Sequence, residues 1–332
     1  MRYVRSLAPI VSTAIVLGAL CWLPGPPPTR AQSDSGPSTC RIGAYLTNLH
    51  AFDPDADTFD ADLWLWSVCP EADRRPLETM EFVNADEVEV LLDVIDDPSW
   101  ASREIRGTFL HDWDERNFPF DHQTLQIVLE EGDEDVRRAV YEPDTANSRA
   151  NPSIQLPGWR MTDFAMRGST TTYYTTFGDP SLSAGGSSDY SRVTLEVGLA
   201  RADLSGFFKL TAVVYAAFGL SLITYVIQRE TTAVGPKVGL LAGALFTTAV
   251  NLVTASSALG SASGLSLVDK IHVVVIVYIL LAAVVAVVSR VLEERGWEAV
   301  TIVRLNSRVG LVALISFVAV NALLIALAAR GG

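Results

Sequence analysis

The chain has 332 residues, of which 49% are hydrophobic and 19% are charged. Residues 32–200 hold 32 acidic and 12 basic side chains, whereas the rest of the chain holds 6 acidic and 13 basic ones. An acidic half joined to an apolar, mildly basic half argues against a single cytosolic globular enzyme. The absence of a basic face in the acidic half argues against a nucleic-acid-binding protein.

Residues 1–31 are typical of a secretory signal peptide. Two arginines precede an apolar run over Leu7–Leu23, and a proline-rich segment follows it. Thr29 and Ala31 supply small residues where a signal peptidase reads the chain, so we expect cleavage near Ala31. An uncleaved anchor is the alternative, but the run is short for a membrane span and ends in prolines.

Residues 32–200 read as short strand-forming runs between Gly, Pro and Asp turns. The clearest alternation of apolar and polar residues lies in Thr58–Trp66. The other runs are Arg41–Leu49, Val88–Ile95, Leu125–Leu129, Arg160–Met166, Thr170–Phe177 and Ser191–Leu199. Strands at this spacing predict an extracellular, immunoglobulin-like β-sandwich.

Residues 201–332 contain four apolar segments, which predict a four-helix transmembrane domain. They span about 207–227, 236–259, 267–289 and 309–330, and each can cross about 30 Å of hydrocarbon as a helix. The domain that precedes these segments is expected to be exported. Because the number of spans is even, both ends of residues 201–332 are then expected on the outer side of the membrane. Lys and Arg in the two inner segments, the second about 18 residues long, agree with the positive-inside rule. The fold class is therefore α+β by chain, with a sandwich followed by a helix bundle.

The second apolar segment is richer in small and hydroxyl-bearing residues than its neighbours. Gly239 and Gly243 lie in its first half, and Thr247, Asn251 and Thr254 share one helical face. Polar groups that face lipid are costly, so this face should meet protein or water. Two interpretations remain open: hydrogen bonding between helices, or the lining of a pore.

A pore would need several copies of this helix around a common axis, because one helix per chain cannot enclose water. Closed pores of this kind often contain an apolar constriction that excludes water. The candidates for it are Leu245 or Phe246, Ala249 or Val250, and Leu252 or Val253. We favour Phe246 and Val250, because the side of the helix that carries Gly243 and Thr254 runs beside them.

Residues 117–125 read Asn-Phe-Pro-Phe-Asp-His-Gln-Thr-Leu and resemble the Phe-Pro-Phe-Asp-x-Gln segment of pentameric ligand-gated ion channels, the Cys-loop receptor superfamily. The resemblance includes the sandwich, Arg201 before the first span, and a polar second span. It implies a homopentamer in the inner or plasma membrane of a prokaryote. His111 and Leu125 stand where animal receptors have the two loop cysteines, as in prokaryotic members.

By this resemblance, the loop of Phe118, Pro119, Phe120 and Asp121 rests on the membrane half and couples it to the sandwich. The resemblance also implies that Asp121 pairs with Arg201, and that the 261–268 connection moves during gating. Without the resemblance, the same residues read as a turn packed on the core of the sandwich.

The resemblance also implies an agonist site between neighbouring subunits, with aromatic walls that can hold a cation. The candidates are Phe82, Trp159, Tyr173, Tyr174 and Tyr190, with Trp64 or Trp66 from the facing subunit. The alternative for each is a place in the sandwich core. A small molecule or protons could be the agonist, because crowded carboxylates raise one another's pKa values.

Cys40 and Cys69 are the cysteines that remain after removal of the signal peptide. Two cysteines in an exported domain predict one disulfide, and two free thiols are the alternative. Asp53, Asp55 and Asp57 crowd the first hairpin. They suggest a Ca²⁺ site that modulates the protein, or a solvated acidic surface. No other cofactor is expected.

Ion selectivity stays open, because an acidic outer domain concentrates cations whereas the Gly235–Leu240 segment resembles that of anion-conducting members. The alternative function is a non-conducting, membrane-anchored receptor or adhesion protein. An enzyme is not expected, because the histidines lack metal-ligand spacing and no phosphate-binding or nucleophile motif occurs.

Overall fold

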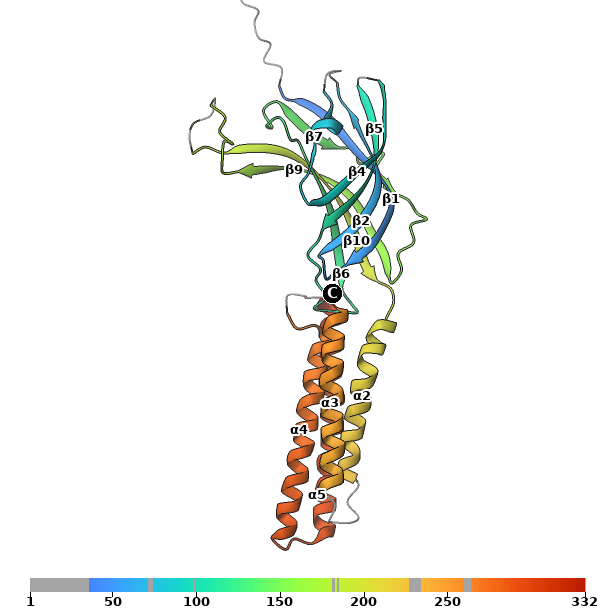
Figure 1. Ribbon diagram of the computed structural model, residues 1–332, viewed down its shortest axis with the longest axis vertical. Coiled ribbons are helices and arrows are strands. Elements are labelled where there is room, and N and C mark those ends of the chain that lie inside the picture. The colour runs from blue at the N-terminus through green and yellow to red at the C-terminus, as the bar shows by residue number, and fades with distance from the viewer. Residues whose placement is uncertain are drawn as a thin grey trace, which may run out of the picture. The chain divides into compact units, whose positions relative to one another are not determined.

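The computed structural model describes residues 36–70, 74–97, 99–180, 183, 185–226, 234–259 and 264–331. The predicted signal peptide lies outside the described residues. Within them, a β domain of two sheets is followed by four long helices (Figure 1). This confirms the predicted α+β fold class.

The larger sheet of the β domain has the strand order β4-β5-β2-β1-β7, with β8 paired to β1. Its strands are β1 (Ser38–Asp53), β2 (Thr58–Val68), β4 (Ala85–Asp97), β5 (Trp100–Leu110), β7 (Ala139–Pro143) and β8 (Arg149–Ala150). A short helix, α1 (Pro76–Thr79), follows β2. β1 pairs antiparallel with β2 and parallel with β7, so the first strand lies inside the sheet.

The smaller sheet has the order β3-β6-β10-β9. Its strands are β3 (Glu81–Phe82), β6 (His122–Glu130), β9 (Trp159–Tyr173) and β10 (Ser188–Arg201). The alternating apolar residues of both sheets share one core: Leu63 and Ile105 from the larger sheet join Leu125, Ile127 and Leu195 from the smaller one. The β domain is therefore held by burial between its two sheets.

Several strands differ from the sequence prediction. The short strands β3, β7 and β8 were not predicted. β5 had no predicted strand, because polar residues occupy its middle. Across the sheet, Arg106 pairs with Asp62 at 2.7 Å and Arg103 forms an ion pair with Asp93, so cross-strand charges replace apolar alternation there. β9 is one continuous strand from Trp159 to Tyr173, whereas the sequence had predicted two separate runs.

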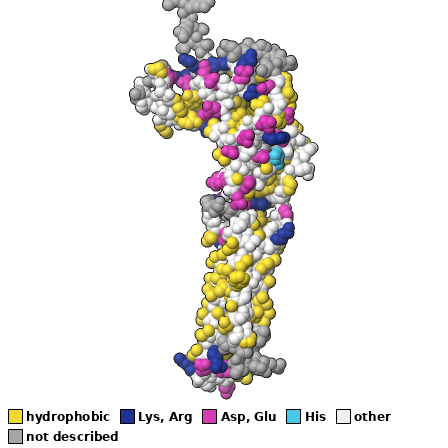
Figure 2. All heavy atoms as spheres, in the orientation of Figure 1, with side chains coloured by type: hydrophobic (Ala, Val, Ile, Leu, Met, Phe, Trp, Pro, Cys, Tyr) yellow, Lys and Arg dark blue, Asp and Glu magenta, His cyan; other side chains and the backbone are white. Residues whose placement is uncertain are grey.

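Four helices are long and apolar enough to cross a membrane. They are α2 (Ser205–Val226), α3 (Val234–Ala258), α4 (Leu267–Glu294) and α5 (Ala299–Gly331). On the face shown in Figure 2, hydrophobic side chains run along these helices, and acidic side chains gather over the β domain. The described chain is thus a four-span membrane protein with a β domain before its helices.

The last two helices extend past their apolar segments. α4 continues to Glu294 and α5 begins at Ala299, so the predicted inner loop of about 18 residues is wrong. Arg290 donates to Glu294 at 2.9 Å, one helical turn away, and such pairs support a helix where apolar burial has ended. The sequence prediction placed the charged residues at these two helix ends in a loop.

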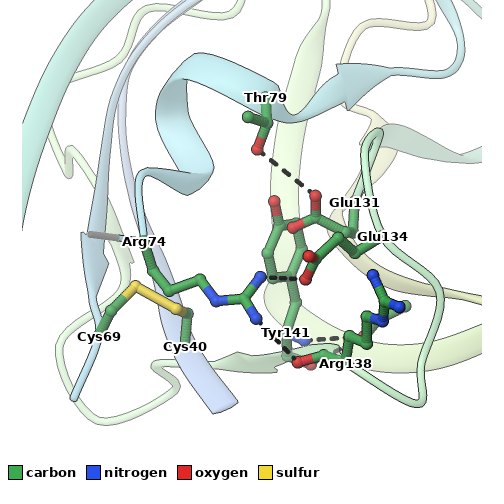
Figure 3. Close-up of a disulfide and its surroundings, with 9 residues drawn as sticks. Cys40, Cys69, Arg74, Thr79, Glu131, Glu134, Arg138 and Tyr141 are labelled. Atoms are coloured by element: carbon green, nitrogen blue, oxygen red, sulfur yellow. Dashed lines mark hydrogen bonds and ion pairs between the residues drawn. A yellow bond between two sulfur atoms is a disulfide. The ribbon is translucent and has the colours of Figure 1, made fainter. Parts of the chain in front are cut away.

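The predicted disulfide between Cys40 and Cys69 is present (Figure 3). β1 and β2 pair Arg41 with Val68, which brings the two neighbouring cysteines opposite one another. The bridge joins residues 29 apart in sequence. In the chain-entropy model, a loop of this length stabilises the folded domain by about 3–4 kcal/mol. A disulfide of this kind is typical of a domain on the non-cytoplasmic side of a membrane.

Candidate functional site

The segment between β5 and β6 packs on the membrane helices through an apolar cluster that includes Phe118. Phe118 is buried, and its cluster contains residues from every helix: Phe207 of α2, Ala255 of α3 with Leu259 just after it, Leu267, Val268 and Ile271 of α4, and Ala328 of α5. Phe120 is half-buried and packs on the same cluster. Pro119 is buried, and the peptide bond between Phe118 and Pro119 is cis. The β domain therefore contacts the helices through apolar burial at this loop.

Arg201, the last residue of β10, connects this loop to the start of the helices. Its Nε lies 2.9 Å from Asp121 Oδ1, and its Nη2 lies 2.8 Å from Glu115 Oε1. Both carboxylate residues are only 2% exposed. The guanidinium carbon also lies 4.6 Å from the ring centre of Phe118 and 4.3 Å from that of Trp159. One buried cation thus holds two carboxylates and two aromatic rings, including the Asp121 pairing that the family resemblance implies.

Glu115 was not identified from the sequence. Burial raises its pKa to about 7; the charge of Arg201 opposes this rise and that of Asp121 adds to it. Its second oxygen, Oε2, is buried and has no hydrogen-bond partner among the described residues. A carboxylate between the aromatic residues Trp113 and Phe118 was the available signal, but its partner Arg201 lies 86 residues later.

A backbone hydrogen bond joins the same loop to α4. The Leu267 amide donates to the carbonyl oxygen of Arg116 at 3.1 Å. Ser266 caps α4 in a capping box with Asp269, which fixes where the helix begins. The described part of the predicted 261–268 connection therefore touches the loop, and residues 261–263 lie outside the described residues.

The polar residues of α3 point in different directions. Asn251 faces the other helices: its amide donates to the Leu210 carbonyl at 2.7 Å and lies 2.9 Å from His272 Nε2. Asn251 therefore meets protein rather than an uncovered face of the helix. Hydrogen bonding between helices, one of the two open interpretations, applies to that residue.

A second side of α3 is left uncovered by the described residues. This α3 stripe consists of Gly239, Gly243, Phe246, Val250, Val253, Thr254 and Ser257, all of which are exposed. Phe246 is the most prominent side chain at 72% exposed, whereas Leu245 packs against the core of the helix bundle. Of the two alternatives for the first constriction position, the structure exposes Phe246.

The hydroxyl groups on the outer half of the α3 stripe are bonded to their own helix. Thr254 Oγ1 donates to the Val250 carbonyl at 3.1 Å, and Ser257 Oγ donates to the Val253 carbonyl at 3.0 Å. Each hydroxyl keeps acceptor lone pairs that point away from the helix. The stripe therefore combines apolar rings in its middle with hydrogen-bond acceptors near its outer end.

Three aromatic rings gather at the end of the β9–β10 hairpin. The ring centres of Tyr173, Phe177 and Tyr190 lie 5.5–6.0 Å apart. The Tyr173 hydroxyl donates to Glu130 Oε1 at 2.8 Å, and Arg192 holds the same carboxylate at 2.6 Å. Tyr173 and Tyr190 were predicted candidates, whereas Phe177 had been read only as part of a strand.

An acidic environment surrounds this aromatic cluster. Burial raises the pKa of Tyr190, and the charges of Asp135, Glu130 and Glu81 raise it further. The hydrogen bond to Glu130 is the main cause of the raised pKa of Tyr173. Arg192, which pairs with Glu130 and donates to the Tyr173 hydroxyl, opposes the rise at Tyr173, so the cluster combines acidic groups with one arginine.

The other aromatic candidates lie elsewhere. Trp159 pairs in register with Arg201, at the opposite end of β10 from Tyr190, so it does not belong to the cluster. Phe82 packs on the sandwich core, and Tyr174 is 94% exposed beside the cluster. Trp64 and Trp66 lie on β2 in the other sheet, where Trp66 Nε1 donates to Asp144 at 3.0 Å.

Asp53, Asp55 and Asp57 form a turn. Asp53 Oδ1 accepts from the backbone amides of Asp55 and Ala56, both at 3.0 Å. The described part of the chain, which includes all three aspartates, contains no group of three or more His, Cys, Asp or Glu side chains able to hold a metal ion. Asp53, Asp55 and Asp57 are therefore not gathered into such a group, and Ca²⁺ binding at this turn stays a hypothesis.

Comparison with known proteins adds no family assignment. No protein-family model matches the chain, and no curated protein matches its sequence at a significant level. The features that bear on function are the disulfide-bonded β domain, the loop that contacts the helices, and the α3 stripe.

Proposed function

We propose that this chain is one subunit of a homopentameric ligand-gated ion channel in a prokaryotic plasma membrane. The observation that carries the proposal is the α3 stripe, an uncovered helix face that offers glycine, aromatic and hydroxyl groups in sequence. Copies of this face around a common axis would enclose a water path.

In this arrangement Phe246 and Val250 form the closed gate. They lie one helical turn apart on the α3 stripe, and rings of such side chains exclude water from a narrow pore. Gly239 and Gly243 have no side chain, so the pore would be wider on the cytoplasmic side of this gate. Thr254 and Ser257 provide acceptor oxygens on the outer side.

The strand β10 supplies the link between a ligand and the gate. It runs without interruption from the aromatic cluster at Tyr190 to Arg201, which is about 36 Å at 3.3 Å per residue. At its far end, Arg201 holds the loop that packs on the helices. A ligand that binds better when this strand shifts would favour the open state by population shift.

The chemistry of the aromatic cluster favours a small organic cation as the agonist. Aromatic faces from Tyr173, Phe177 and Tyr190 stand beside acidic groups, and such faces bind ammonium ions. In the assembled channel, Trp64 and Trp66 of a neighbouring subunit would complete the pocket, because they lie on the opposite sheet.

The test is current recording from purified protein in planar bilayers, with tetramethylammonium and proton steps as probes. Phe246→Ala removes the ring at the gate and should shift activation to at least tenfold lower probe concentration. Leu245→Ala is the matched control, because Leu245 packs inside the helix bundle. Reversal potentials under salt gradients would then report the selectivity.

Native mass measurement separates the channel from its alternative. A pentamer that conducts, with the gate effect confined to Phe246→Ala, supports the proposal. A mass other than five subunits, together with no current under either probe, would instead indicate the non-conducting anchored receptor.

A further inference from the structure

The charges at the inner ends of α4 and α5 are balanced on one helix and unbalanced on the other. On α4, Arg290 pairs with Glu293 at 3.4 Å and with Glu294 at 2.9 Å. α5 contains no Asp or Glu along its whole length. Its two inner arginines, Arg304 and Arg308, have no ion pair or side-chain hydrogen bond among the described residues. Their guanidinium donors are therefore available to a partner.

Arg304 and Arg308 lie on the side of α5 that points away from the other helices. Ile302, Asn306 and Gly310 are buried, and the two exposed arginines alternate with them along the helix. Two residues correspond to about 200° of rotation in an α-helix, so the arginines lie opposite the buried side. Because α5 packs against α2 and α4 through its buried side, the arginines face what surrounds the helix bundle.

The depth of this end of α5 in the membrane follows from the apolar run beyond it. Residues 309–329 contain no charged side chain, and at 1.5 Å per residue they span about 31 Å, the thickness of the hydrocarbon core. Asn306 donates to Ser289 of α4 at 2.8 Å, and Arg290 follows directly, so both helices become polar at one level. On the face shown in Figure 2, charged side chains gather at this end of the helices. Since the disulfide-bonded β domain is typical of the non-cytoplasmic side, this level is that of the inner-leaflet headgroups.

The exposed face of α5 changes from polar to aliphatic in the order that a phospholipid does. Thr301, Arg304 and Arg308 follow one another at three and four residues and are all exposed. The two arginines are about 6 Å apart along the helix axis, and a guanidinium can donate two parallel hydrogen bonds to phosphate oxygens. Val312 and Ile315 continue the same face at 65% and 61% exposed.

We propose that this face binds an anionic phospholipid of the inner leaflet. Arg304 and Arg308 donate to its phosphate oxygens, the Thr301 hydroxyl donates to its headgroup, and one acyl chain lies along Val312 and Ile315. A phosphatidylcholine fits less well, because its choline group brings a second positive charge beside the arginines. The site depends on α5 alone and goes beyond the proposed channel function.

The experiment measures lipid binding to the purified full chain in detergent by native mass spectrometry. The probes are dioleoyl-phosphatidylglycerol and dioleoyl-phosphatidylcholine, which have the same acyl chains and differ in headgroup charge. The wild type should prefer the anionic lipid by about fivefold for each arginine, or about 25-fold in all. Arg304→Gln and Arg308→Gln should each reduce this preference about fivefold, and the double variant should lose it.

Arg330→Gln is the matched control, because Arg330 is an exposed arginine at the outer end of the same helix. This variant should keep the preference of the wild type. A second control is glycerol 1-phosphate, which carries the charge of the headgroup without acyl chains and should not displace the bound lipid.

Three results would overturn the assignment. Equal binding of the two lipids to the wild type would show that the arginines are only hydrated. An unchanged preference in the double variant, or an equal loss in Arg330→Gln, would place the lipid elsewhere. Displacement by glycerol 1-phosphate would indicate a site for a free phosphate ester. Because the readout is mass rather than current, failure of this proposal is distinct from failure of the channel proposal.

Discussion

Glu115 should make the stability of the protein depend on pH in an unusual direction. Its pKa is raised from 4.5 to about 7 in the folded state, mainly by burial. The folded protein therefore keeps a proton on this group at pH values where the unfolded chain has lost it. The stability from this proton is fully present below pH 4.5 and is lost as pH rises through 7.

The size of the effect follows from the two pKa values. Between pH 5 and pH 8, the contribution of Glu115 to the free energy of unfolding falls by about 2–3 kcal/mol. For a domain of this size, that corresponds to a fall of roughly 5–10 °C in Tm. Glu115→Gln keeps the shape of the side chain but does not titrate, so this part of the pH dependence should disappear.

The assay is thermal unfolding of the purified full chain from pH 5 to pH 8, followed by tryptophan fluorescence. The quantity compared is the difference in Tm between the wild-type protein and Glu115→Gln at each pH. His111, whose pKa is lowered by burial, titrates in both proteins and cancels in this difference. Glu142→Gln, at an exposed carboxylate on β7, serves as the control. Parallel Tm curves for wild type and Glu115→Gln would refute the reasoning.

Three further predictions concern stability. Arg201→Gln leaves two buried carboxylates without their cation and should lower the free energy of unfolding by about 3–5 kcal/mol, measured by denaturant titration. Serine at Cys40 and Cys69 should lower it by about 3–4 kcal/mol, and a reducing agent should have the same effect on the wild type. Asn251→Leu should cost about 1–3 kcal/mol, whereas Thr254→Val should stay within about 0.5 kcal/mol; equal losses would contradict their different surroundings, one bonded to other helices and one exposed.

Features that depend on local periodicity could be predicted from the sequence. The alternation that placed Phe59 and Leu63 on one face of β2 matches the buried core, because side chains in a strand alternate between faces. The apolar segments located the membrane helices for a similar reason, since length and hydropathy decide a span. β5 could not be found this way, because Arg103 and Arg106 are stabilised by carboxylates on neighbouring strands.

The site depends on pairs that are distant in the sequence, and only some were predictable. Asp121 and Arg201 are 80 residues apart and were expected only through the family resemblance. Glu115 lies between Trp113 and Phe118 in the sequence, but its partner Arg201 is 86 residues later, so its burial was not predicted. The direction of Asn251 was also missed, because a helical face that carries three polar residues does not show which of them meets His272.

The segment from Trp113 to Asp121 connects the β domain to the helices. It supplies Phe118 to the helix contact, and Glu115 and Asp121 to Arg201. Arg201 is the last residue of β10 and the shared partner of both carboxylates, so in the proposed channel a shift of β10 that opens the pore would change the surroundings of Glu115. By linkage, the protonation state of Glu115 must then shift the open-state equilibrium in the corresponding direction. Activation of the proposed channel should therefore depend on pH in the wild type and lose this part of its pH dependence in Glu115→Gln.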